Sequence, residues 1–285
     1  MKPAKFEYRA PRELEEALSI LAEVGDEGKV LAGGQSLVPS MNFRLARPAV
    51  LVDINGIGGI DSVTSSSDHL VIGTLARHVR FERPVTDGPL GHLLALAARK
   101  VGHRPIRIRG TFGGSLAHAD PAAEWCMIAT LLDATMVASS VRGQREITAS
   151  NFFKTVFSTA LEPDELLTEA RLPLLNPAAK IGFVEFSRRA GDFAIVAASS
   201  VLDVEGGRIS TARIALGSVG GTPLRSPAAE AVLQGNVPSG ELFAEAGEAA
   251  AGDVEPMGDI HGSPEYRRDL VRVLTRRSLQ ASTEH

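Results

Sequence analysis

Apolar residues near the start of the chain follow two different spacings. Between residues 11 and 24 they recur at intervals of three and four behind Pro11, which suits the first turn of a helix, so this segment predicts a surface helix with one buried face. The runs KVLAG (29–33) and AVLVDI (49–54) are short and apolar, and Gly, Pro and Asn bound them, which favours buried strands. Residues 1–57 are therefore predicted as helix, strand, glycine turn and strand.

The middle of the chain mixes the same two patterns. The sequence HLVIGTL (69–75) alternates as a strand does, and residues 88–102 carry the apolar spacing of a helix that ends at Gly102. Proline, asparagine and small residues at 174–180 predict a linker. Between these segments the patterns predict a helix over 122–134 and strands over 135–141 and 166–174.

The last third separates into strands and then helices. Apolar runs over 180–226 predict antiparallel strands, two of them joined by a turn at Glu205-Gly206-Gly207. Helical spacing follows over 226–235, 240–252 and 264–282. We therefore expect two domains, over residues 1–176 and 177–285.

Composition excludes several classes of protein. A net charge of −4 over 285 residues argues against nucleic acid as the main partner, because phosphate backbones are bound by excess Lys and Arg. The N-terminal residues lack the apolar core of a secretory signal, and no stretch of about 18 uncharged apolar residues occurs, which predicts a cytoplasmic protein without a transmembrane segment. Cys126 is the only cysteine, so no intrachain disulfide can form, and a four-thiolate iron–sulfur cluster or a cysteine-type zinc site would need a partner chain.

Two pairs of glycines carry the clearest chemical signal. The first lies in KVLAGGQSLVPSM after a predicted strand, and the second lies in TFGGSLAHAD. We call residues 32–37 the first glycine motif and residues 111–115 the second. Because glycine has no Cβ, successive amides in such a turn can converge on an anion. We expect the two motifs to hold one pyrophosphate from two sides, with hydroxyls of Ser36, Thr111 and Ser115 as further donors; the alternative is that both are ordinary tight turns.

The familiar dinucleotide signatures do not occur. The chain contains neither G-x-G-x-x-G after a predicted strand nor G-x-x-x-x-G-K-[ST], so a Rossmann domain and a P-loop are both unsupported.

Other polar residues near the second motif allow more than one interpretation. His118 and Asp120 could form a metal pair or a base with its orienting acid, or Asp120 could cap the helix after Pro121; a metal site is not expected, because no third ligand has a suitable spacing. The basic strip at 103–109 could neutralise a pyrophosphate, dock a partner, or form a salt-bridged face. Cys126 is predicted to be a buried, inert thiol.

Four segments together resemble a known family. They are AGGQSLVPSMNFRLARPAVLVDING (32–56), R-x-RGTFGGSLAHADPAAE (107–124), TALEPDELLTEARLP (159–173) and SRRAGDFAIVAAS (187–199). The chain is similar in all of them to the FAD-binding medium subunit of molybdenum hydroxylases, in the carbon monoxide dehydrogenase and xanthine dehydrogenase superfamily. The resemblance implies an α+β fold, with an FAD-binding domain of the vanillyl-alcohol-oxidase (PCMH) type over 1–176, in subdomains of about 1–57 and 58–176. A small antiparallel sheet-and-helix domain, the CO dehydrogenase flavoprotein C-terminal domain, would follow over 177–285.

The resemblance also implies which residues bind the cofactor. FAD would be held non-covalently, with its pyrophosphate against both glycine motifs, while no residue of this chain would be catalytic or ligate a metal. Glu124 would bind a ribose or ribityl hydroxyl, and Asp120 would accept hydrogen bonds from the flavin or its loop. The implied FAD-binding residues are Ala32, Gly33, Gly34, Gln35, Ser36, Leu37, Val101, Thr111, Gly113, Gly114, Ser115, Asp120, Glu124 and Leu166.

The sequence departs from the family pattern at a few of these places. A lysine reaches the flavin edge in xanthine-type members, whereas this chain has Val184 or Glu185 there. Gln35 and Ser115 stand where some relatives carry His and Asn. Phe193 follows Gly-Asp where several relatives carry an aromatic residue near the isoalloxazine, although a buried strand aromatic is an equally good interpretation.

The function implied by the resemblance is electron transfer within an oxidoreductase. A large subunit with a molybdenum cofactor would oxidise the substrate, [2Fe–2S] clusters on a small subunit would carry the electrons, and the FAD of this chain would deliver them to an external acceptor, in a dimer of heterotrimers. The alternatives are a free-standing FAD-dependent oxidase or reductase, and a flavin-free scaffolding subunit. The substrate (carbon monoxide, an aldehyde, a purine or an N-heterocycle) and the acceptor (NAD, a quinone or a cytochrome) stay open.

Overall fold

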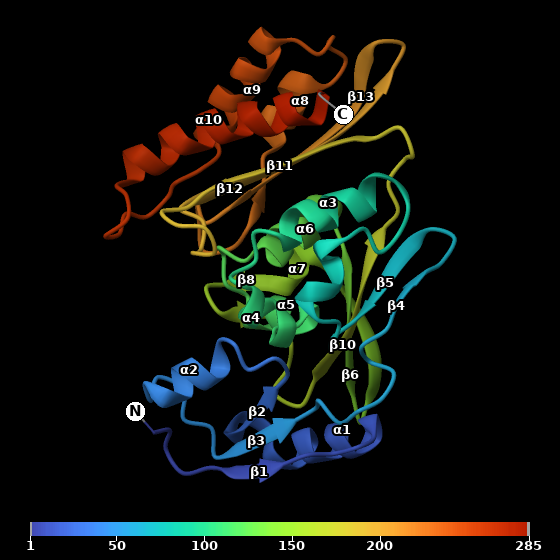
Figure 1. The fold of residues 1–285 in the computed structure, drawn as a ribbon, viewed down its shortest axis with the longest axis vertical. Coiled ribbons are helices and arrows are strands. Elements are labelled where there is room, and N and C mark those ends of the chain that lie inside the picture. The colour runs from blue at the N-terminus through green and yellow to red at the C-terminus, as the bar shows by residue number, and fades with distance from the viewer. Residues whose placement is uncertain (1, 284–285) are drawn as a thin grey trace.

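Three main sheets lie along the long axis of the computed structural model, within residues 2–283, which the structure describes (Figure 1). Helices lie beside each sheet, so the expected α+β fold is confirmed. No helix among the described residues is both long and apolar enough to cross a membrane.

The first sheet is parallel and lies at the N-terminal end of the molecule. Its strands are β1 (Glu7–Arg9), β3 (Val50–Asp53) and β2 (Gly28–Leu31), in that order. Parallel strands need crossover connections, which here include α1 (Leu14–Val24), the 3₁₀ helix η1 (Gly25–Glu27) and α2 (Leu37–Asn42). Apolar residues of α1 such as Ala17 and Leu21 pack with Val52 of β3 in one hydrophobic cluster. The sequence predicted α1, β2 and β3, but not β1 or α2.

The second sheet is antiparallel and forms the middle of the molecule. Its strands, in order, are β4 (Val63–Ser65), β5 (His69–Gly73), β10 (Leu166–Pro173), β6 (Thr135–Ser140) and β7 (Gly143–Thr148). The associated elements are η2 (His78–Glu82), α3 (Gly88–Ala98), α4 (Arg104–Arg109), α5 (Phe112–His118), α6 (Glu124–Leu132), α7 (Ala149–Phe152) and the small pair β8 (Phe153–Thr155) and β9 (Ser158–Thr159).

Helix α6 lies at the centre of this part of the fold. It is apolar on nearly all sides, which is typical of a helix that is buried all round. Its residue Trp125 packs against the rings of Phe81 and Phe112. The two aromatic ring centroids lie 5.3 and 5.0 Å from that of Trp125. The same cluster extends into the third sheet.

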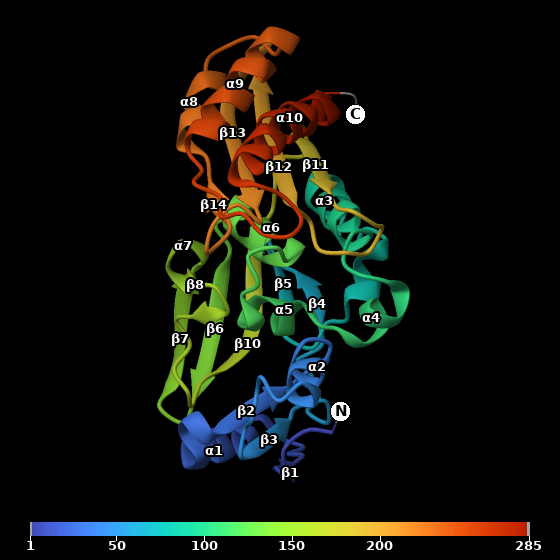
Figure 2. The same cartoon turned by 90° about the vertical axis from the view of Figure 1, so that its left-hand side faces the viewer.

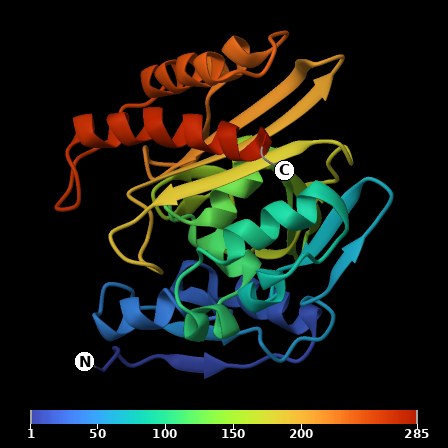
Figure 3. The ribbon, with the colours of Figure 1, turned by 45° about the horizontal axis from the view of Figure 1, so that its top comes forward.

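The third sheet is antiparallel, with strands β11 (Lys180–Phe186), β12 (Val196–Glu205), β13 (Arg208–Gly217) and β14 (Leu224–Arg225). The predicted turn joins β12 to β13, where Gly206 and Gly207 have φ of +57° and +78°. Helices α8 (Pro227–Leu233), α9 (Gly240–Gly252) and α10 (Pro264–Thr283) cover its outer face, and Figure 3 shows α9 and α10 running side by side. Helices α3 and α6 contact its inner face (Figure 2).

Alternation along the strands divides the third sheet between two hydrophobic cores. Ala197 and Val201 of β12 belong to the core of the middle part, whereas Val196, Ala198 and Leu202 belong to the core under the C-terminal helices. The sheet is therefore a wall common to both parts of the molecule. The exact domain boundaries given above stay predictions.

Candidate functional site

The first glycine motif is a tight turn between β2 and α2. Gly34 has a φ of +70°, a left-handed conformation that suits glycine. A Cβ on Gly33 would lie 2.5 Å from the carbonyl oxygen of Arg109 and 2.6 Å from the Cα of Gly110. The turn therefore contacts the backbone that leads into the second motif, and any side chain on Gly33 would separate them.

The amides of this turn are open. The N–H groups of Gly33, Gly34, Gln35 and Ser36 donate to no acceptor in residues 2–283. The Gln35 side chain instead donates from Nε2 to the carbonyl of Gly33 at 3.0 Å, which braces the turn from within. Successive amides with no internal acceptor can bind an anion, so the first motif has the donors that the sequence led us to expect.

The second glycine motif differs from the first, because it is the start of helix α5. Gly113 donates to the carbonyl of Thr74 at 3.0 Å, Gly114 donates to Oγ1 of Thr111 at 3.1 Å, and Ser115 donates to the carbonyl of Thr111 at 3.0 Å. Thr111 is thus the N-cap of α5. The expectation of a second open turn is wrong, because its glycine amides are already used inside the protein.

Close packing explains the glycines of the second motif. A Cβ on Gly113 would lie 2.0 Å from Oγ1 and 2.6 Å from the Cα of Thr74, and a Cβ on Gly114 would lie 2.6 Å from Oγ1 of Thr111. A threonine three residues before Gly114 is a common cap pattern, and it is the sequence signal that could have identified the helix start.

The two motifs nevertheless lie against each other, as expected. Besides the contact of Gly33 with Arg109 and Gly110, a Cβ on Gly114 would lie 3.6 Å from the Cβ of Ala32. Residues 80 positions apart in the chain (113 − 33) are therefore brought to one place. An open turn lies beside a closed helix start.

One buried and one half-buried acid lie close to the contact between α6 and the third sheet. Glu124, the first residue of α6, is 5% exposed, and burial raises its pKa to about 8, with the carboxylates of Glu185 and Asp120 adding to this. Glu124 is therefore mostly protonated at neutral pH, and its carboxyl group can donate as well as accept. Burial also raises the pKa of Glu185, while Lys100 opposes the shift.

The strand register distinguishes Val184 from Glu185. Val184 packs against the core under the C-terminal helices, so Glu185, its neighbour on β11, points to the opposite face. The Oε2 atom of Glu185 is buried and has no hydrogen-bond partner among the described residues. Glu185, and not Val184, is therefore the side chain on the face of β11 that is turned toward the core of the middle part, the face that also carries Phe183.

Asp120 and the remaining predicted residues have varied surroundings. Oδ1 of Asp120 accepts from the amide of Ala122 at 2.9 Å, which makes a short turn before α6, while Ala123 is the N-cap of that helix.

Val101 and Leu166 are both buried, but they belong to different hydrophobic clusters, and Leu166 shares its cluster with Ala32. Ser36 is the N-cap of α2 without a side-chain cap bond, and Leu37 is its first residue.

Phe193 is exposed, so the interpretation of it as a buried strand residue is wrong. It is 61% exposed on the loop between β11 and β12. In the same loop a Cβ on Gly191 would lie 2.5 Å from the ring of His103, so the loop packs on the turn before α4.

The other candidates have ordinary structural surroundings. In the basic strip, Arg107 and Arg104 lie 2.7 and 3.6 Å from the carboxylate of Glu82, which favours the salt-bridged interpretation for these two residues. His118 stacks on Phe157 with ring centroids 4.8 Å apart, and burial lowers its pKa. Cys126 is fully buried and burial raises the pKa of its thiol, as expected for an inert cysteine.

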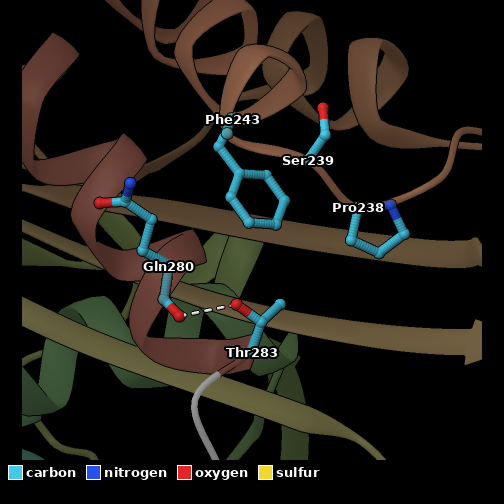
Figure 4. Close-up of a pocket in the computed structure, with 6 residues that line it drawn as sticks. Pro238, Ser239, Phe243, Gln280 and Thr283 are labelled. Atoms are coloured by element: carbon cyan, nitrogen blue, oxygen red, sulfur yellow. Dashed lines mark hydrogen bonds between the residues drawn. The ribbon is translucent and has the colours of Figure 1, made fainter.

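Two surface hollows accompany these features. One, of about 490 Å³, is lined by residues that include Asn55, Arg77 and Arg80, none of which the sequence singled out. The other lies between α9 and α10 at the far end of the molecule (Figure 4), where Oγ1 of Thr283 donates to the carbonyl of Gln280. Its lining residues include Pro238, Ser239 and Phe243 and carry no charge.

Comparisons with known proteins agree along the chain. A family model described as "FAD binding domain in molybdopterin dehydrogenase" matches residues 4–175, and one described as "CO dehydrogenase flavoprotein C-terminal domain" matches residues 182–282. The chain is 40% identical over 280 residues to the 6-hydroxypseudooxynicotine dehydrogenase complex subunit alpha of Paenarthrobacter nicotinovorans, covering 98% of this chain and 95% of that one. It is 38% identical over 285 residues to the caffeine dehydrogenase subunit beta of Pseudomonas sp. (strain CBB1), covering 100% and 97%.

A solved structure has the same fold. Carbon monoxide dehydrogenase from Hydrogenophaga pseudoflava, in a form that lacks the Mo-pyranopterin moiety of the molybdenum cofactor, contains a chain that superposes with a TM-score of 0.96 at 34% identity. The match covers 100% of this chain and 99% of that one.

Proposed function

This chain belongs to the FAD-binding subunits of the molybdenum hydroxylases, and from that premise we propose that it is the electron-transfer flavoprotein subunit of a multi-subunit dehydrogenase. In this role it receives electrons from [2Fe–2S] clusters of a partner subunit and passes them to an external acceptor. FAD supplies the redox chemistry when bound, and the chain supplies its binding and orientation.

The residues of the first glycine motif fit such a cofactor. FAD carries a pyrophosphate, and the observation that supports its placement is the row of open amides at Gly33, Gly34, Gln35 and Ser36. These residues, with Ala32 and Leu37, would hold the pyrophosphate through backbone N–H groups. An acidic protein can bind two phosphate charges in this way without a cluster of lysines.

The second glycine motif would have a different part in the same site. Since the amides of Gly113, Gly114 and Ser115 are already paired, we propose that Thr111 and the two glycines form a close-fitting wall beside the first motif. The hydroxyl of Ser115 makes no hydrogen bond in the described chain, and it would add a side-chain donor.

The remaining proposed contacts are side-chain contacts. Glu124, protonated at neutral pH, would bind a ribityl or ribose hydroxyl as donor or acceptor. Val101 and Leu166 would supply apolar surface, and Asp120 would act through the turn that it closes before α6.

The proposed partners are a large subunit with the molybdenum cofactor and a small subunit with two [2Fe–2S] clusters, in a dimer of heterotrimers. The single, buried cysteine of this chain supports a division of labour in which clusters lie elsewhere. Relatives of similar length are named for substrates as different as caffeine and carbon monoxide, which supports substrate oxidation on another polypeptide. The cytoplasmic location stays a prediction.

The test is the visible spectrum of the purified chain, alone and with its co-expressed partner subunits, followed by acid release of the pigment. We expect FAD in both samples, iron–sulfur absorption only in the complex, and flavin bleaching by substrate only in the complex. A colourless chain that takes up no added FAD would contradict the proposal. Substrate turnover by the isolated chain would instead indicate a free-standing oxidase.

A further inference from the structure

Two polar residues outside both glycine motifs connect the motifs from behind. Nδ2 of Asn55 donates to the carbonyl of Ala32 at 2.8 Å, and Oδ1 of Asn55 accepts from Nη2 of Arg77 at 2.6 Å. Nη1 of the same arginine donates to the carbonyl of Arg109, two residues before the second motif. One continuous chain of hydrogen bonds thus runs from the first motif through two side chains to the backbone that leads into the second.

The backbone places both side chains for this role. Asn55 follows β3, where the amide of Ile54 donates to the carbonyl of Leu31 at 3.1 Å. Arg77 pairs with Thr111 across a short bridge, in which His78 donates to Gly110 at 3.1 Å and Phe112 donates to Ala76 at 2.8 Å. The segment of Asn55 is therefore bonded to the residue that precedes the first motif, the segment of Arg77 is bonded to the start of the second, and the Asn55–Arg77 bond joins the two segments.

Asp53 determines which way the Asn55 amide points. Its Oδ1 accepts from the backbone N–H of Asn55 at 2.9 Å and from Nδ2 at 2.6 Å, while Oδ2 accepts from the hydroxyl of Tyr8 at 2.5 Å. A flipped amide would face its oxygen toward two oxygens and its NH₂ toward a guanidinium. The amide oxygen is therefore held toward Arg77.

Arg77 is committed to this bridge and not to an ion pair. No carboxylate of the described chain lies within 4.0 Å of its guanidinium, in contrast to Arg107, which pairs with Glu82. A planar guanidinium donates in two fixed directions at once, which is what joining an amide oxygen to a carbonyl oxygen requires.

We propose that Asn55 and Arg77 are positioning residues that hold the two glycine motifs at the spacing needed for FAD binding. This inference rests on the function proposed above. Neither residue needs to touch the cofactor: Asn55 fixes Ala32, which precedes the open amides, and Arg77 fixes the backbone against which Gly33 packs. Donors held in place before the ligand arrives bind more tightly, because less order is lost on binding.

The test compares FAD affinity in single and double variants of the full chain. We expect Arg77→Lys and Asn55→Ala each to raise the FAD dissociation constant about 10- to 100-fold, as for the loss of a charge-assisted hydrogen bond. Lysine keeps the charge but cannot donate in both directions, so a purely electrostatic role would survive this change. The double variant is expected to be no weaker than the worse single variant, because either change breaks the same bridge.

The matched control is Arg80→Lys. Arg80 lies three residues after Arg77, and its Nη1 donates to the carbonyl of Asp61 at 3.1 Å, a bond that does not join the motifs. The Arg80→Lys variant should therefore bind FAD with unchanged affinity. The visible circular dichroism of the bound flavin should change in the bridge variants and not in the control. Denaturant unfolding of the FAD-free proteins separates this effect from a loss of stability, and Asn55→Ala provides the test if Arg77→Lys does not fold.

The outcomes distinguish the inference from the function on which it rests. Native FAD affinity in both bridge variants, or losses that simply add in the double variant, would overturn the positioning role while FAD binding by the unmodified chain still stands. Failure of the unmodified chain to bind FAD would instead overturn the proposed function.

Discussion

The two glycine pairs look alike in the sequence and behave differently in the structure. At the first, the chain turns through a left-handed glycine and leaves four amides without an acceptor among residues 2–283. At the second, the glycines lie in the first turn of a helix, and their amides bond to Thr74 and Thr111. The comparison shows that glycine can be needed for backbone conformation at one place and for close packing at another, and only the first leaves donors for a ligand.

The largest expected effect breaks the packing at the second pair. In Gly113→Ala the new Cβ would meet the backbone and hydroxyl of Thr74. We therefore expect the free energy of unfolding, measured in denaturant, to fall by about 3 kcal/mol. Gly58→Ala is the matched control, because a Cβ there has no atom within 4 Å. A loss in Gly113→Ala that is no larger than in the control would show that the second pair is a loose turn after all.

A smaller effect is the loss of unfolding free energy at low pH through His78, which lies in the same region. His78 accepts from Trp125 at 2.9 Å beneath the second motif, and burial lowers its pKa to about 4, with the charges of Arg77 and Arg107 adding to this. The pKa of His78 is lower in the folded protein than in the unfolded chain, so the unfolded chain binds more protons as the pH falls from about 6.5 toward 4. The stability that this group contributes above pH 6.5 is therefore lost between pH 6.5 and pH 4.

Between pH 7 and pH 5 this group should remove about 2 kcal/mol of unfolding free energy. Urea unfolding at the two pH values measures the loss, and the His78→Gln variant should lack this portion of it, since the amide oxygen can still accept from Trp125. An identical pH dependence in the two proteins would assign the acid sensitivity to other groups.

The smallest effect concerns the first pair. Gly34→Ala places a Cβ at positive φ, where it meets only the ends of the Leu31 and Val38 side chains at 3.1 and 3.2 Å, so we expect a loss of about 1 kcal/mol. FAD affinity should fall more clearly than stability, because the open amides move. Gly34→Asn, which tolerates this conformation better, should retain more of both; equal behaviour of the two variants in thermal melts and FAD titration would argue against a conformational role.

Long elements with one clear period could be predicted from the sequence. The helix at 11–24 and the hairpin turn at Gly206-Gly207 are found, with helix ends shifted by a few residues. The short helix α2 contains Pro39, and the exposed strand β1 has no apolar face, so neither has a period to detect. The choice between Val184 and Glu185 needed the strand register, because neighbours on a strand face opposite sides.

The site was predicted in part. That the two motifs meet could be inferred from their shared chemistry, and the approach of Gly114 to Ala32 confirms it. The bridge through Asn55 and Arg77 could not, because it depends on side chains 22 positions apart that only the folded backbone brings within 2.6 Å. Of the closed amides of the second motif, that of Gly113 depends on an equally non-local contact with Thr74, whereas those of Gly114 and Ser115 bond to Thr111 and follow a cap pattern visible in the sequence.

The third sheet has a consequence for how such chains can be recombined. Two family models meet near residue 180, as if the halves were interchangeable modules. Yet one face of β12 and β13, through Ala197, Val201 and Ala215, completes the core of the preceding half. A chimera that joins halves from two relatives therefore has a mismatched core unless these inward-facing residues come from the same parent as the N-terminal half. The crossover must then be made at alternate residues of the strands and not at a single point in the gene.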